Sequence, residues 1–160
     1  MKYLQGYPAQ IISQAQQLLD EGKLGQYLAR KYPEKNPHNS DKALYEFVMT
    51  MKNRYMRKSA HLSRICYDKS IRRVDQALGM HMRISRNQGG RLQAKQEIRI
   101  AEMFKTAPLG LLEMIVAHEL SHLKEADHNK AFYQLCCHMV PDYHQRELDT
   151  RLYLHWIESQ

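Results

Sequence analysis

The segment from His118 to His122 places two histidines four residues apart, with Glu119 directly after the first. Positions four apart on a helix differ by only about 40° around its axis, so both rings can point to one metal ion. Glu119 is rotated to one side, where its carboxylate can act as general base toward water that the metal activates. The spacing therefore predicts a zinc site with Glu119 as the catalytic residue.

A catalytic zinc site needs a third protein ligand and one open position. His128 follows the point where the helix should end, and a turn at Ala126 and Asp127 would let its ring fold back. Glu125 and Glu147 are alternative third ligands, because carboxylates also bind zinc. We favour His128, since neutral imidazole suits zinc and its position is favourable.

Two further groups of residues could act on the substrate. Tyr143 and His144, in the last predicted helix, could polarise a carbonyl or stabilise negative charge opposite the zinc. A predicted β-hairpin carries basic residues that could hold phosphates, namely Arg83, Arg86, Arg91 and Lys95. This hairpin is expected to flank the cleft.

The spacing of apolar residues predicts the elements that position these groups. Helices are predicted over residues 8–20, 23–31, 41–55, from Pro108 through the His118–His122 motif, 130–139 and 142–157. Alternating patterns predict strands at 64–68, 80–86 and 92–100, with a turn at 87–90. We expect an α+β fold with a small antiparallel sheet. It should be one domain, with a helical part over 1–58 and a catalytic core over 59–160.

Composition limits the environment and the partners. There are 24 Lys and Arg against 17 Asp and Glu, a net charge of +7 that favours polyanionic partners such as nucleotides or nucleic acid. The three cysteines, two of them adjacent, form no disulfide framework and suit a reducing cytoplasm. We find no signal peptide, and Glu113 interrupts the longest apolar run, so we expect a cytoplasmic protein without a membrane partner.

Several segments resemble the YgjP-like metallopeptidase family over nearly the whole chain. They are "LQGYP", "DKALY", "SRNQGGRLQAKQEIRIA", "IVAHELSHLKEADHNKAFYQLCCHMVPDYHQ" and "DTRLYLHW". The family is similar to the small zincins called minigluzincins and, more remotely, to SprT-like proteases, in which the third histidine is also followed by x-x-x-Phe. The resemblance implies a zincin-like α+β fold, zinc on His118, His122 and His128, and Glu119 as the catalytic acid/base.

Three functions are compatible with these residues. The leading hypothesis is a zinc-dependent hydrolase that cleaves peptides, with an extended substrate pairing along a strand edge. In the alternative, the same site attacks phosphorus in a nucleoside triphosphate, with the basic hairpin residues holding the phosphates and pyrophosphate released. The third is a binding module that contacts nucleic acid through its basic surface.

Overall fold

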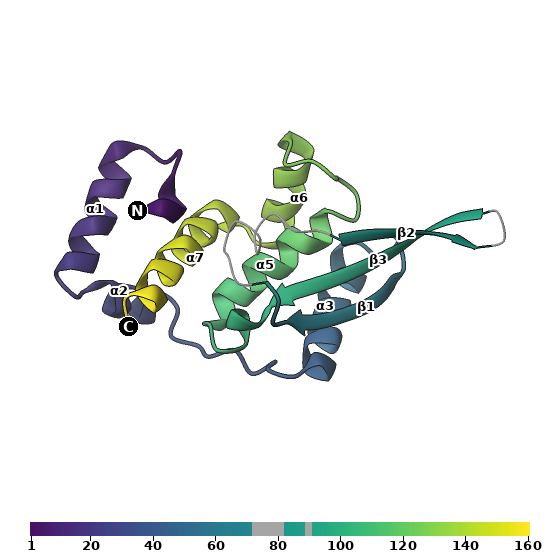
Figure 1. Ribbon diagram of the computed structural model, residues 1–160, viewed down its shortest axis with the longest axis horizontal. Coiled ribbons are helices and arrows are strands. Elements are labelled where there is room, and N and C mark those ends of the chain that lie inside the picture. The colour runs from purple at the N-terminus through teal and green to yellow at the C-terminus, as the bar shows by residue number, and fades with distance from the viewer. Residues whose placement is uncertain (72–81, 89–90) are drawn as a thin grey trace.

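The computed structural model describes residues 1–71, 82–88 and 91–160, and for 82–88 and 91–95 it describes the backbone alone. The first part contains the short 3₁₀-helix η1 (Lys2–Leu4) and helices α1 (Ala9–Asp20), α2 (Leu24–Lys31) and α3 (Asp41–Tyr55). The second contains β1 (Leu62–Asp68), β2 (Met82–Gln88), β3 (Arg91–Ala101), the 3₁₀-helix η2 (Glu102–Lys105), α5 (Leu109–Ser121), α6 (Lys130–Met139) and α7 (Tyr143–Glu158) (Figure 1). The α+β class and the predicted helices are confirmed.

The sheet differs from the predicted antiparallel sheet because it is mixed, with strand order β1-β3-β2. Strands β2 and β3 form the expected antiparallel hairpin, which extends away from the helices in Figure 1. Strand β1 runs parallel to β3, pairing Ile65 with Ile98 and Tyr67 with Ile100. The prediction was wrong for β1 because an alternating pattern identifies a strand but carries no information on the direction of its neighbour.

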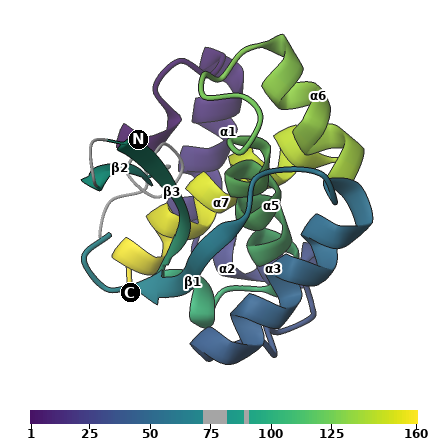
Figure 2. The same ribbon diagram turned by 90° about the vertical axis from the view of Figure 1, so that its right-hand side faces the viewer.

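Helix α5 runs through the middle of the molecule, with β3 on one side and α6 and α7 on the other (Figures 1 and 2). Every residue from Met114 to Ser121 is buried, and a helix that is covered all round must be largely apolar. In the described part of the chain no helix, α5 included, combines the length and apolar character needed to cross a bilayer. Because His118, Glu119 and His122 are buried, the polar residues of the motif lie inside the protein core.

Helix α5 begins and ends at defined positions. Pro108 precedes its first residue, and the amide of Leu109 donates to the carbonyl of Glu34, which fixes the start against the loop after α2. The helix ends at Ser121, earlier than predicted, and His122 follows with helical backbone angles. The i,i+4 relation between His118 and His122 is therefore kept, and the chain turns immediately afterwards.

A buried carboxylate joins α7 to α2. Asp149 is fully buried and accepts hydrogen bonds from the hydroxyls of Tyr27 (3.0 Å) and Tyr32 (2.5 Å). The ammonium of Lys31 lies 3.0 Å from its second oxygen, so the negative charge is both neutralised and hydrogen-bonded. Burial, followed by the Asp149 hydrogen bond and charge, raises the pKa of Tyr32. This network fixes the helix that carries Tyr143 against the N-terminal helices.

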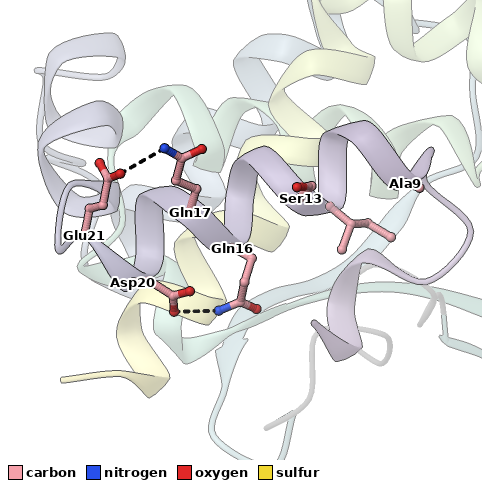
Figure 3. A pocket seen from close by; sticks show the side chains of 7 residues that line it. Ala9, Ser13, Gln16, Gln17, Asp20 and Glu21 are labelled. Carbon is pink, nitrogen blue, oxygen red and sulfur yellow. Dashed lines mark hydrogen bonds between the residues drawn. The ribbon is translucent and has the colours of Figure 1, made fainter.

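The outer face of α1 carries a shallow surface hollow lined by Ala9, Ile12, Ser13, Gln16, Gln17, Asp20 and Glu21 (Figure 3). Its amide and carboxylate side chains bond to each other along the helix, Gln16 to Asp20 at 2.8 Å and Gln17 to Glu21 at 2.9 Å. These are exposed i,i+4 pairs of the kind that contribute little to stability. Their small contribution to stability can be compared with that of the buried Asp149 network.

We predict that Asp149→Ala lowers the free energy of unfolding by about 3 kcal/mol, because two partly buried tyrosine hydroxyls lose a charged acceptor. Urea unfolding followed by circular dichroism measures this change. Gln16→Ala, which removes one exposed pair on α1, should change stability by less than about 0.5 kcal/mol. Equal unfolding midpoints for the two variants would contradict the structural role of Asp149.

Candidate metal centre

Three histidines converge at the end of α5. The Nε2 atom of His122 lies 3.3 Å from Nε2 of His118 and 3.1 Å from Nε2 of His128. One ligand atom from each of the three lies within 4.8 Å of the others. Among the side chains that the structure describes, no other group of three His, Cys, Asp or Glu residues meets in this way.

The Nδ1 atoms of His118 and His122 each have a defined partner. His122 Nδ1 lies 2.9 Å from the backbone carbonyl of Glu125, which can only accept, so this nitrogen carries the proton. His122 Nε2 is then unprotonated in the neutral ring and directs its lone pair toward the other two histidines. His118 Nδ1 lies 2.7 Å from the hydroxyl of Tyr143, which can accept in the same way.

The loop between α5 and α6 brings His128 back to the pair. Leu123, Lys124 and Glu125 continue as a tight turn in which their amides donate to carbonyls of Leu120 and Ser121. Asn129 then caps α6, its side-chain oxygen accepting from the amide of Phe132 at 2.9 Å. The capped start of α6 therefore limits the positions that His128, one residue earlier, can adopt.

Phe132 packs against all three imidazoles. Its ring centroid lies 5.0 Å from that of His118, 4.5 Å from His122 and 4.9 Å from His128, and the side chain is fully buried. An aromatic ring at these distances limits how far each imidazole can rotate. The sequence predicts no role for Phe132 beyond the family's x-x-x-Phe pattern, because an apolar residue near the start of a helix is typical of any hydrophobic core.

The three nitrogens fit a divalent transition metal. Tetrahedral ligands about 2.05 Å from zinc are separated by about 3.3 Å, close to the separations of 3.3 and 3.1 Å found here. Neutral imidazole lone pairs that face one another repel, and a cation between them turns this repulsion into binding. Metal-binding histidines normally donate their second ring nitrogen to a nearby acceptor, and the backbone carbonyl of Glu125 is this acceptor for His122 Nδ1.

The centre is buried on one side and open on the other. His118 and His122 are each 2% exposed and Glu119 is 1% exposed, whereas His128 is an exposed residue. Glu119 therefore lies inside the core next to the first histidine, where low dielectric strengthens its interactions with nearby charge. Of the three histidines only His128 is exposed, so a substrate can approach the centre from its side.

Tyr143 and His144 lie in different positions. Tyr143 is fully buried with its hydroxyl against His118 Nδ1, on the far side of that ring from the three Nε2 atoms. His144 is exposed, with its ring 5.1 Å from that of Tyr133, which in turn lies 6.4 Å from the ring of His128. His144 is therefore on the open side, and its role as a charge-stabilising group stays a prediction.

The other candidate ligands lie apart from the three nitrogens. The carboxylate of Glu125 accepts from Asn129 Nδ2 at 3.2 Å, and that of Glu147 lies 3.3 Å from the guanidinium of Arg151. Neither belongs to the convergent group, so the structure brings His128 to the pair instead. The backbone carbonyl of Glu125, which no sequence pattern could indicate, is the part of that residue that contacts a histidine.

The basic hairpin residues are placed by their backbone alone. Arg83 pairs with Gln96, Arg86 with Gln93, and Arg91 with Gln88, while Lys95 pairs with Ile84. Their side chains lie outside the described part of the structure, so their proposed contact with phosphates stays a prediction.

Cys136 is close to the centre but chemically quiet. Burial raises the pKa of its thiol to about 12, and the thiol donates a hydrogen bond to the hydroxyl of Ser121 at 3.3 Å. Cys136 does not belong to the group of ligand atoms that converge, and this group consists of three imidazoles.

A helix with the His-Glu-x-x-His pattern and a third converging histidine defines a metal-dependent hydrolase. The sequence model of the family described as "YgjP-like, metallopeptidase domain" matches residues 3–152, and the chain belongs to this family. A curated relative, the UTP pyrophosphatase of Escherichia coli (strain K12), is 51% identical over 154 residues, which cover 96% of this chain and 92% of the relative. No solved structure matches the chain.

We predict that the protein binds one zinc ion and that His128→Ala weakens zinc binding by more than about 100-fold, since losing a ligand exceeds the effect of losing an outer partner. Competition with a chromophoric chelator measures the affinity. His138→Ala is the matched control, because this exposed histidine packs only its ring edge against Tyr55, with centroids 5.3 Å apart. Unchanged affinity in His128→Ala would exclude it as a ligand.

Proposed function

We propose that this protein is a nucleoside triphosphate pyrophosphohydrolase that depends on zinc held by His118, His122 and His128. The observation that carries the proposal is the 51% identity, over nearly the full length of both chains, to a protein named UTP pyrophosphatase. The convergent imidazoles supply a centre that can perform such a hydrolysis. In this proposal all 160 residues act as one domain, with the helical part over 1–58 supporting a zincin-like catalytic core over 59–160.

The chemistry begins with water on the open side of the centre. His118, His122 and His128 would hold the zinc, which would supply the positive charge that lowers the pKa of a bound water to about 7 and stabilises negative charge on a phosphoryl oxygen. Glu119, one residue along α5 from a ligand, accepts the proton of the attacking water. Its burial keeps this carboxylate away from bulk solvent, so the proton moves over a short and defined path.

The proposed reaction breaks one phosphoanhydride bond. Water attacks the α-phosphorus, a new P–O bond forms there, and the bond from this phosphorus to the oxygen that bridges to the β-phosphorus breaks. Pyrophosphate leaves, the nucleoside monophosphate keeps the new oxygen, and Glu119 has received one proton of the water. Protonated Glu119 can return this proton to the leaving group or to solvent.

The charge of the protein suits such a substrate. A net charge of +7 attracts a triphosphate, and the exposed position of His128 makes the centre accessible from solvent. We assign the phosphate contacts to basic residues of the hairpin, from among Arg83, Arg86, Arg91 or Lys95, because guanidinium and ammonium groups bind phosphate oxygens. Of the two strands that carry them, β3 also contacts α5.

Peptide hydrolysis is the expectation that this proposal replaces. The same donor set could polarise a peptide carbonyl, and the family description includes the word metallopeptidase. The named activity of the relative favours the phosphoanhydride. Contact with nucleic acid through the basic surface stays a prediction.

We expect zinc-loaded protein to release pyrophosphate from a panel of ribonucleoside and deoxyribonucleoside triphosphates and to leave a pooled peptide library intact. Hydrolysis in ¹⁸O-labelled water should place the label in the nucleoside monophosphate, as attack at the α-phosphorus requires. Mass spectrometry of both products measures this. Label in pyrophosphate, or peptide cleavage without pyrophosphate release, would contradict the proposed reaction.

Glu119→Gln should lower kcat for pyrophosphate release by about 10²–10⁴-fold, because the amide cannot accept the proton. Zinc content, measured by elemental analysis, should stay at the wild-type level, since Glu119 is not a ligand. Glu113→Gln is the control on the same helix, where the carboxylate is 37% exposed and lies 3.6 Å from Arg146. Wild-type turnover in Glu119→Gln would remove Glu119 from the mechanism.

A further inference from the structure

The segment that runs from the middle of α3 almost to the end of β1 is basic throughout. Residues 47–67 contain no Asp or Glu, although Glu46 precedes them and Asp68 follows. Their five basic residues are Lys52, Arg54, Arg57, Lys58 and Arg64. The segment therefore carries five formal positive charges and no negative one, while all 17 acidic residues of the chain lie outside it.

Four of these charges lie at the surface. Arg54 at the end of α3, Arg57 and Lys58 in the loop that follows, and Arg64 on β1 are all exposed. Lys52 is buried instead, and its ammonium donates to the backbone carbonyl of Ser59 at 3.5 Å. The loop between α3 and β1 runs along the side of the molecule that faces the viewer in Figure 2. The exposed cations therefore lie on three consecutive parts of the chain.

The exposed cations of this segment have no acidic partner. Within residues 1–71, 82–88 and 91–160, none of the four forms an ion pair. Exposed lysines elsewhere do, since Nζ of Lys2 lies 3.3 Å from Glu158 and Nζ of Lys23 lies 2.8 Å from Glu21. Like charges that share one surface without counter-charges repel one another, and a bound polyanion would remove this repulsion.

The apolar residues of the segment lie inside the protein. Met56, Leu62 and Ile65 are buried, and among the described residues Tyr45 is the one large hydrophobic side chain that is exposed. A protein interface needs an apolar centre, and a helix or loop on a membrane surface inserts apolar side chains between the lipids. This segment offers neither, whereas interfaces with nucleic acid are polar and strongly positive.

The end of α3 also restricts one of the cations. The guanidinium of Arg54 lies 5.1 Å from the ring centroid of Tyr55, and this ring meets the ring of His138 on α6 edge-on, with centroids 5.3 Å apart. An arginine held over an aromatic ring loses less conformational entropy when it binds a phosphate. Arg54 is therefore partly ordered before a ligand arrives.

We propose that residues 54–64 form a binding surface for the phosphate backbone of a nucleic acid, with Arg54, Arg57, Lys58 and Arg64 as the phosphate contacts. Contacts of this kind hold a strand in place without reading its sequence. The surface contains none of the residues proposed to hold zinc or the triphosphate. It therefore adds a partner to the proposed function and does not depend on it.

The test compares two double variants that lose the same charge. Arg57→Gln/Lys58→Gln removes two of the four contacts. Lys2→Gln/Lys23→Gln removes two exposed lysines from the N-terminal part of the chain and is the matched control. Fluorescence anisotropy with short labelled single-stranded RNA, single-stranded DNA and duplex DNA measures the affinity, and circular dichroism checks that both variants are folded.

We expect the wild-type affinity for single strands to fall about 50-fold between about 50 and about 200 mM salt, because four phosphate contacts release counterions. In Arg57→Gln/Lys58→Gln the affinity should be lower at about 50 mM salt and should fall only about sevenfold over this range, since two contacts remain. Lys2→Gln/Lys23→Gln should keep the wild-type salt dependence. Binding of any of the three oligonucleotides in this pattern supports the proposal, and the tightest one identifies the form of nucleic acid.

Three outcomes would overturn the proposal. The first is no binding of any oligonucleotide by the wild-type protein at low salt. The second is equal weakening in the two double variants, which would assign the binding to net charge alone. The third is unchanged oligonucleotide binding in Arg57→Gln/Lys58→Gln with a raised KM for nucleoside triphosphates, which would assign these side chains to the substrate. Because the assay reads binding and not turnover, failure of the proposed pyrophosphohydrolase activity would leave its result unaffected.

Discussion

The metal centre depends on the placement of three polar side chains inside an apolar core. Helix α5 is buried from Met114 to Ser121, yet it carries His118 and Glu119, and His122 follows directly. Three imidazole nitrogens that face one another are favourable only when a cation or proton lies between them. The surrounding helices therefore have two tasks, to exclude water from one side of this cluster and to fix each ring in the tautomer that a cation needs.

Rigidity and access come from different elements. Phe132 and the capped start of α6 fix the rings from one side, while α7 contacts His118 through Tyr143 from another. His128 lies on an exposed loop and leaves the remaining side open. The N-terminal segment lies beside α7, the last helix, as Figure 1 shows, and the amide of Tyr3 donates to His155 there.

The same centre suits two reactions, because carbonyl and phosphoryl hydrolysis both place negative charge on an oxygen that a metal can bind. The donor set alone therefore carries no preference between a peptide and a nucleotide. The preference comes from the curated relative, whose name specifies UTP, and from a positive net charge that suits an anionic substrate. Family membership and substrate class are thus separate conclusions, and the first does not imply the second.

The sequence by itself determined the helices and the pairing of His118 with His122, because both follow from spacing along one helix. It also favoured His128 over Glu125 and Glu147. Only the tertiary structure decided that β1 is parallel to β3 and that Tyr143 lies behind His118. The contact of Phe132 with all three imidazoles is likewise set by the packing of α6 against α5. Periodicity records which face of an element is buried, whereas the partner that covers this face is set by packing between segments distant in the chain.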